Sequence, residues 1–190
     1  ALDYCLSAGP WRAEDIDAVV FYEDPELKTD RLFQTFSHFS PKGYAGFRRG
    51  FSSWVGERVH QSDQIVAEFE KRFPNAEWQS KIVCTEHHLS HAASAFYPSP
   101  FEEAAILTMD GVGEWATTSL AVGRGSKIEL LREIKFPHSL GLLYSAFTYF
   151  TGFKPNSGEY KVMGLAPYGE PRYVDRILGE VIDLKEDGSF

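Results

Sequence analysis

The chain has 190 residues, and its 19 Lys and Arg against 27 Asp and Glu give a formal net charge of −8. With 43% hydrophobic and 15% aromatic residues, it is too apolar to be a disordered protein. The negative charge argues against a general grip on nucleic-acid backbones, which requires clustered Lys and Arg. It still allows a nucleotide site, because backbone N–H groups alone can bind a phosphate.

The two cysteines, Cys5 and Cys84, provide no disulfide framework, and no signal-peptide pattern opens the chain, so we expect a cytoplasmic protein. Residues 136–153 carry no Asp, Glu, Lys or Arg and are about long enough to span a membrane. The same stretch contains Pro137, Gly141 and Gly152, so we interpret it as a buried helix and expect no membrane partner.

The first half of the chain alternates helices and short apolar strands. Apolar spacing and end signals predict helices over 1–9, where Gly9 is the stop, and over 26–39, 56–73 and 87–96, with strands over 18–22 and 81–85. Residues 43–54 are rich in Gly and aromatics and show no clean period. The opening helix has no cap, and residues 185–190 resemble a hairpin turn without its second strand. We therefore expect this sequence to be a piece of a longer protein.

The second half predicts an antiparallel meander followed by helices. Strands are expected over 104–111, 117–122 and 128–134, joined by short polar turns. Helices are expected over 140–150 and 171–181, with an ordered loop at 156–169 between them. The whole pattern is that of a mixed α/β protein.

A histidine cluster follows the strand at 81–85. Three of the six histidines, His87, His88 and His91, fall within five residues. On a helix His87 and His91 share one face, one turn apart, and two imidazoles at that spacing can bind one divalent metal. No Glu follows the first His, so a zinc-peptidase mechanism is not supported. His88 faces elsewhere, and the alternative reading of the cluster is a surface or helix-capping group.

A Gly-rich turn follows the strand at 104–111. Asp110 begins it and can bind a metal directly or through water. Gly111 and Gly113, on either side of Val112, let the backbone approach a ligand, and successive N–H groups in such a turn can hold a phosphate. The alternative is an ordinary hairpin, since Asp-Gly is a strong hairpin signal.

Further along the chain, Lys161 lies in the predicted loop at 156–169. It is a candidate partner for phosphate or a carboxylate, and a solvated surface Lys is the alternative.

Taken together, residues 86–101, 107–114 and 158–169 resemble the nodulation-type and antibiotic-type O-carbamoyltransferases, in the same order and over most of the chain. The resemblance implies an α/β fold of the actin/Hsp70/sugar-kinase-like ATPase class, close to the enzyme domain that makes threonylcarbamoyladenosine in tRNA. A second, YrdC-like domain would make carbamoyl-adenylate from carbamoyl phosphate and ATP. The present domain would then pass the carbamoyl group to a hydroxyl of a sugar-containing or other small-molecule acceptor.

Carried over by position, the resemblance implies that His87, His91 and Asp110 bind a divalent metal, either iron or an ion such as Mg, Mn or Zn. The turn at 111–113 and Lys161 would contact the nucleotide. A general base must take the proton of the acceptor hydroxyl, and His88 is a candidate for this role.

The resemblance also implies a domain organisation. Residues 1–102 would be the remainder of a first subdomain with a helical insertion and the histidine helix, and 103–190 the start of a second subdomain with the phosphate hairpin. A first phosphate loop, a final metal carboxylate, the adenosine-binding segment and the YrdC-like domain would lie outside the chain. We therefore expect the chain alone to be inactive, with exposed edges that allow a dimer.

Two alternative functions stay open from the sequence. One is threonylcarbamoyl-type transfer to tRNA adenosine, against which the acidic charge weighs. The other is a non-catalytic module that binds a metal or a nucleotide.

Overall fold

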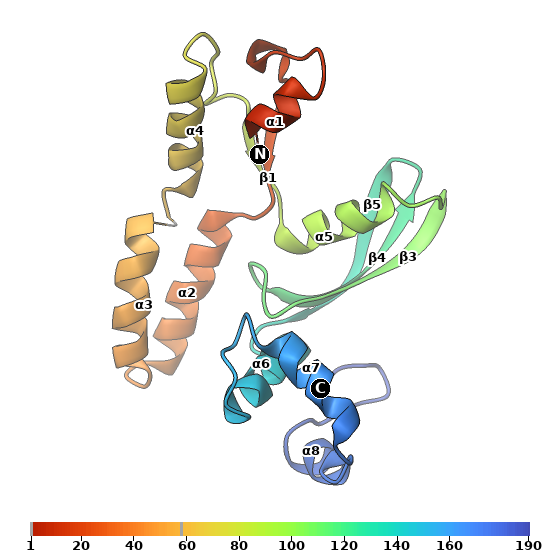
Figure 1. Cartoon of the computed structure of the whole chain (residues 1–190). Coiled ribbons are helices and arrows are strands. Elements are labelled where there is room, and N and C mark those ends of the chain that lie inside the picture. The colour runs from red at the N-terminus through yellow and green to blue at the C-terminus, as the bar shows by residue number, and fades with distance from the viewer. Residues whose placement is uncertain (1, 58) are drawn as a thin grey trace. The chain divides into compact units, whose positions relative to one another are not determined.

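The structure, a computed structural model, describes residues 2–57 and 59–190 (Figure 1). The chain divides into two compact units, unit 1 up to Ser90 and unit 2 from His91, with the boundary inside helix α5 (His87–Phe96). Helices accompany a two-stranded parallel pair in unit 1 and a three-stranded antiparallel sheet in unit 2. The predicted mixed α/β class and antiparallel meander are therefore confirmed.

Unit 1 is mostly helical. Its elements are α1 (Leu2–Ser7), a 3-10 turn (Ala13–Asp15), β1 (Val19–Phe21), α2 (Pro25–Phe39), α3 (Tyr44–Glu57), α4 (Gln61–Arg72) and β2 (Ile82–Cys84). Strands β1 and β2 run parallel, with Val20 opposite Val83. The core of the unit forms around Trp78, which has no exposed surface and whose indole N–H donates to the carbonyl of Phe73 at 2.9 Å.

Helix α3 lies in the segment for which the sequence predicted no regular element. It runs beside α2 (Figure 1), and the rings of Phe36 on α2 and Phe47 on α3 stack with centroids 3.9 Å apart. Glycines at 46 and 50 weaken the intrinsic helix propensity of α3. Aromatic packing against α2 supplies the stabilisation that propensity does not, which explains why the local pattern gave no clear period.

The predicted helix over 56–73 begins later than expected. The structure ends α3 at Glu57 and starts α4 at Gln61, so one predicted helix is divided between two observed ones. Residue 58 lies outside the described residues. Among the described residues, no helix is both long and apolar enough to cross a membrane.

Unit 2 continues from the rest of α5 into the sheet and then into helices. Its further elements are β3 (Glu103–Met109), β4 (Ala116–Arg124), β5 (Lys127–Lys135), α6 (Leu140–Phe150), α7 (Glu159–Leu165), a 3-10 turn (Ala166–Tyr168) and α8 (Val174–Glu180). The predicted loop at 156–169 is thus largely helical, and the last predicted helix is shorter than 171–181. The predicted subdomain boundary at 102 stays a prediction.

Helix α5 packs on one face of the antiparallel sheet (Figure 1). The registers pair Ile106 with Ala121 on neighbouring strands, and both side chains belong to one buried cluster with Ala92 and Phe96 of α5. The ring of Phe96 lies so close to Gly123 that a Cβ there would come within 2.7 Å of it. Since successive side chains of a strand alternate between faces, this contact fixes which face of the sheet α5 covers.

The carboxylate of Glu159 organises the junction between α6 and α7. It accepts the hydroxyl of Ser145 at 2.7 Å and the backbone N–H groups of Asn156 at 2.9 Å and Gly158 at 3.2 Å. Hydrogen bonds from the Asn156 backbone, the Ser145 hydroxyl and nearby backbone amides lower the pKa of Glu159 to about 2. The charged carboxylate thereby accepts the backbone N–H groups of the residues that precede α7.

We predict that Phe96→Ala lowers the free energy of unfolding by about 3–5 kcal/mol, since it removes a buried aromatic ring and leaves a cavity between α5 and the sheet. Chemical denaturation of the full chain measures the change. Phe101→Ala is the control, because Phe101 is 62% exposed, and we expect a change within about 0.5 kcal/mol. Equal, small effects of the two substitutions would contradict the packing described here.

We also predict a pH-dependent role for Glu159. Because its folded pKa lies below the ordinary value of 4.5, its charge stabilises the fold above that value, and the stabilisation is lost as pH falls from about 4.5 to about 2. Glu159→Gln should therefore melt at a lower temperature than the parent chain at pH 7, with a difference that shrinks below about pH 4.5.

The control for the pH effect is Glu180→Gln, in the exposed pair with Arg176 on α8. It should melt close to the parent chain at neutral pH. A Glu159→Gln difference that stays constant from pH 7 to pH 3 would show that the charge of Glu159 does not act on stability.

Candidate functional site

Helix α5 presents two of its histidines on one face. The helix begins at His87, and the four-residue spacing places the imidazoles of His87 and His91 one turn apart. The His91 side chain is 48% exposed and the His87 side chain 15%. The predicted helix over 87–96 and its pair of same-face histidines are therefore present in the structure.

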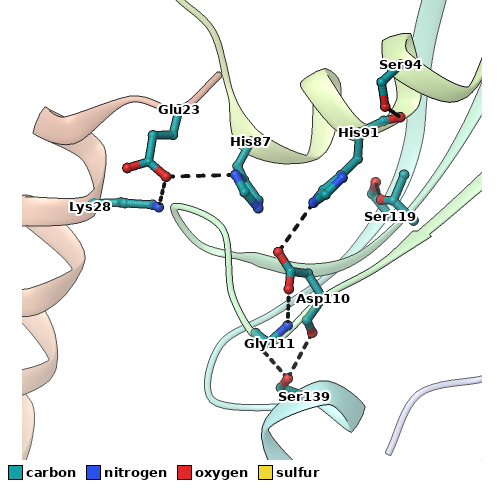
Figure 2. A network of polar contacts seen from close by, with 10 residues as sticks. Glu23, Lys28, His87, His91, Ser94, Asp110, Gly111, Ser119 and Ser139 are labelled. Carbon is teal, nitrogen blue, oxygen red and sulfur yellow. Dashed lines mark hydrogen bonds and ion pairs between the residues drawn. The ribbon is translucent and has the colours of Figure 1, made fainter. Parts of the chain in front are cut away.

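Asp110 lies directly after β3, in the turn that leads to β4. Its backbone N–H donates to the carbonyl of Thr117 at 2.9 Å, which extends the β3–β4 ladder by one bond. Its Oδ1 accepts the N–H of Gly111 at 2.6 Å, and its Oδ2 lies 3.4 Å from Nε2 of His91 (Figure 2). The turn therefore holds one carboxylate oxygen by the backbone and directs the other toward α5.

The sequence-predicted metal ligands come together. His87, His91 and Asp110 each offer one ligand atom, and these atoms all lie within 4.8 Å of one another. The continuous helix sets the spacing of the two histidines, and the packing of α5 on the sheet brings His91 to Asp110. Two imidazoles and one carboxylate suit Fe²⁺, Mn²⁺ or Zn²⁺, so the residues fit the implied divalent metal.

A buried ion pair lies beside His87 in unit 1. Glu23 follows β1 and bonds through Oε2 to the ammonium of Lys28, near the start of α2 (Figure 2). The same oxygen lies 3.9 Å from Nδ1 of His87. That separation is longer than a hydrogen bond, so the carboxylate acts on the ring of His87 through its charge.

Neither Glu23 nor Lys28 was predicted from the sequence to lie beside the histidine helix. The available signal was a pair of acidic residues, Glu23 and Asp24, directly after a buried strand and before Pro25 at the start of a helix. That pattern indicates a helix N-cap, and Asp24 does accept the backbone N–H groups of Glu26 and Leu27.

The other predicted residues lie apart from this cluster or are already engaged. The N–H of Gly111 donates to Asp110, and that of Gly113 donates to the carbonyl of Ala116 at 2.8 Å. His88 is buried, with 3% of its surface exposed. Lys161 is exposed on α7, with its ammonium 5.9 Å from the centroid of the Tyr160 ring.

Contacts of phosphate with the turn at 111–113, and with Lys161 on α7, therefore stay predictions. A phosphate that took the Gly111 N–H would have to compete with the Asp110 carboxylate. The proposed role of His88 as a base is likewise a prediction, and its burial is also what a packing residue shows.

Comparison with known proteins gives a family assignment. A family model described as carbamoyltransferase N-terminus matches residues 1–190. An uncharacterised protein of Synechocystis is 52% identical over 196 residues, which cover 100% of this chain and 31% of that protein. Nodulation protein NolNO of Sinorhizobium fredii is 34% identical over 194 residues, which cover 100% of this chain and 26% of that protein.

A shorter match gives the same assignment. Nodulation protein NolO of Bradyrhizobium diazoefficiens is 38% identical over 104 residues, which cover 55% of this chain and 19% of that protein. The chain thus spans less than a third of the length of each of these relatives. The resemblance stated from the sequence motifs is confirmed, and the chain belongs to the carbamoyltransferase N-terminus family.

Proposed function

We propose that this chain belongs to an enzyme that transfers a carbamoyl group from carbamoyl-adenylate to a hydroxyl of a sugar-containing or other small-molecule acceptor. The adenylate would be made from carbamoyl phosphate and ATP by a further domain, of the YrdC-like kind. Membership of the carbamoyltransferase family supports group transfer. The observation that carries the site is the convergence of His87, His91 and Asp110.

The reaction makes one bond and breaks another at the carbamoyl carbon. The acceptor oxygen joins that carbon, and the bond from the carbon to the phosphate oxygen breaks, so that AMP leaves with the bonding electrons. The hydroxyl proton passes to a base, which must lie within hydrogen-bond reach of the acceptor. A divalent metal, when bound, would supply Lewis-acid polarisation of the adenylate.

In the proposed reaction, the residues of this chain would hold the metal ion and orient its ligands. His91 and Asp110 would each provide one ligand from unit 2, and their partly exposed side chains leave the site open to a ligand from solution. His87, on the same helix as His91, would provide a further ligand, and the carboxylate of Glu23 lies 3.9 Å from its Nδ1. The buried Lys28 balances the charge of Glu23, which would otherwise be costly to bury.

A small-molecule acceptor is favoured over tRNA by charge. The chain carries −8, and a protein that grips RNA needs a basic surface to meet the phosphates. We also propose that unit 2 is part of the actin/Hsp70/sugar-kinase-like ATPase fold. Its antiparallel meander, with Asp110 in the β3–β4 turn, supports this assignment.

We predict that His91→Ala and Asp110→Ala, made in the full-length protein, each lower carbamoyl transfer by at least about 10-fold, because each removes a metal ligand and even the loss of an outer partner of a ligand costs about 10- to 100-fold. The assay follows label from carbamoyl phosphate, with ATP, into a panel of sugars, aminoglycosides and tRNA. Pyrophosphate release, which reports adenylate formation in the other domain, should persist in both variants.

His60→Ala is the matched control for this assay, because His60 is an exposed histidine outside the cluster. It should transfer at the rate of the parent enzyme. Transfer retained within about threefold in both ligand variants would refute the proposed metal site, since loss of a ligand costs more than that. Transfer of the label to tRNA, and to none of the small molecules, would refute the proposal that the acceptor is a small molecule.

A further inference from the structure

The start of α6 is attached to the turn that carries Asp110. Ser139, the N-cap of α6, is 5% exposed and accepts the backbone N–H of Leu142 at 3.0 Å. Its hydroxyl donates to the carbonyl of Gly111 at 2.6 Å and lies 3.3 Å from the carbonyl oxygen of Asp110 (Figure 2). An N-cap hydroxyl needs only its acceptor role to cap a helix, so the donated bond to the turn is additional.

A glycine allows this approach. A Cβ at Gly141 would lie 2.4 Å from the carbonyl oxygen of Asp110 and 2.7 Å from the N of Gly111. Those atoms are backbone and cannot swing aside as a side-chain tip does. The first turn of α6 therefore lies directly against the Asp110–Gly111 peptide.

A second bond closes the arrangement into a ring. Thr117 falls at a register shift of β4 and has no exposed surface. Its hydroxyl donates to the carbonyl of His138 at 2.6 Å, and its own carbonyl accepts the N–H of Asp110 at 2.9 Å. Hydrogen bonds and chain connections thus link Asp110 to Thr117, to His138 and Ser139, and back to Gly111.

The ring fixes the orientation of one peptide plane. In a trans peptide the C=O and the following N–H point to opposite sides. The Asp110 carbonyl lies against α6, so the Gly111 N–H points away from α6, where it donates to Oδ1 of Asp110 at 2.6 Å. With Oδ1 held in this way, Oδ2 is the oxygen directed at His91.

We infer that Ser139 is a positioning residue for the Asp110 carboxylate: by donating to the Gly111 carbonyl it holds the turn in the observed orientation, in which Oδ2 faces His91. The inference rests on the proposed function for its consequence in metal binding. The positioning itself can be measured without any metal.

Two measurements on the full chain test it. The first is the exchange rate of the Gly111 amide in the metal-free chain, followed by NMR. The second is the Kd for Co²⁺, used as the probe ion, by calorimetry. We predict that Ser139→Ala speeds Gly111 exchange and weakens Co²⁺ binding by about 10-fold, as loss of an outer partner of a metal ligand does. Ser139→Thr, which keeps a hydroxyl, should restore both.

Thr148→Ala is the matched control. Thr148 is a fully buried hydroxyl on the same helix, and it donates to the carbonyl of Tyr144 within α6. It should lower the melting temperature without changing Gly111 exchange or the Kd. If Ser139→Ala lowers the melting temperature but leaves Gly111 exchange at the parent rate, the inference is overturned and Ser139 is a helix cap alone.

The two proposals fail in different ways. If the parent chain shows no Co²⁺ binding that depends on His91, the proposed metal site fails, and Gly111 exchange still decides whether Ser139 positions the turn. If the parent chain binds Co²⁺ and Ser139→Ala binds it equally well, the metal site stands and the positioning role is overturned.

Discussion

The packing of helix α5 against the antiparallel sheet is the contact on which the candidate site depends. Ala92 and Phe96 bury themselves against Ile106 and Ala121, and the Phe96 ring lies on the backbone of Gly123. His91 directly precedes Ala92 on the helix. A change in this contact would shift His91 relative to Asp110, whose position is set by the sheet. The apolar contact therefore determines the geometry of the polar one.

The polar residues of the two units differ in exposure. His91 and Asp110 are half and one-third exposed, so they can meet a ligand at little cost. Glu23 and Lys28, beside His87, are buried, and a buried ion pair is seldom retained for stability alone because desolvation offsets most of its attraction. His87 therefore lies beside a buried ion pair, whereas His91 and Asp110 are open to solvent.

Much of this arrangement follows from local sequence. The helix over 87–96 and the meander were predictable because period 3.6 and period 2 both match the faces that are buried. Four-residue spacing predicted that His87 and His91 share one face of that helix, whereas the complete candidate set with Asp110 was implied only by the resemblance to O-carbamoyltransferases.

Long-range packing limited the rest. Helix α3 depends on ring stacking with α2, and α7 on the side chain of Glu159, which accepts backbone N–H groups at its start. Ser139 shows in sequence only the pattern of an N-cap, and its bond to Gly111 joins residues 28 positions apart. No local pattern reports such a contact.

We propose above all that α5 and the turn after β3 together bind one metal ion. The most direct test is a crystal structure of the chain with Co²⁺, with data collected at the cobalt absorption edge. We predict one anomalous peak about 2.0–2.3 Å from a nitrogen of His87, a nitrogen of His91 and an oxygen of Asp110. An ion bound elsewhere, with these three side chains unliganded at saturating Co²⁺, would contradict the account.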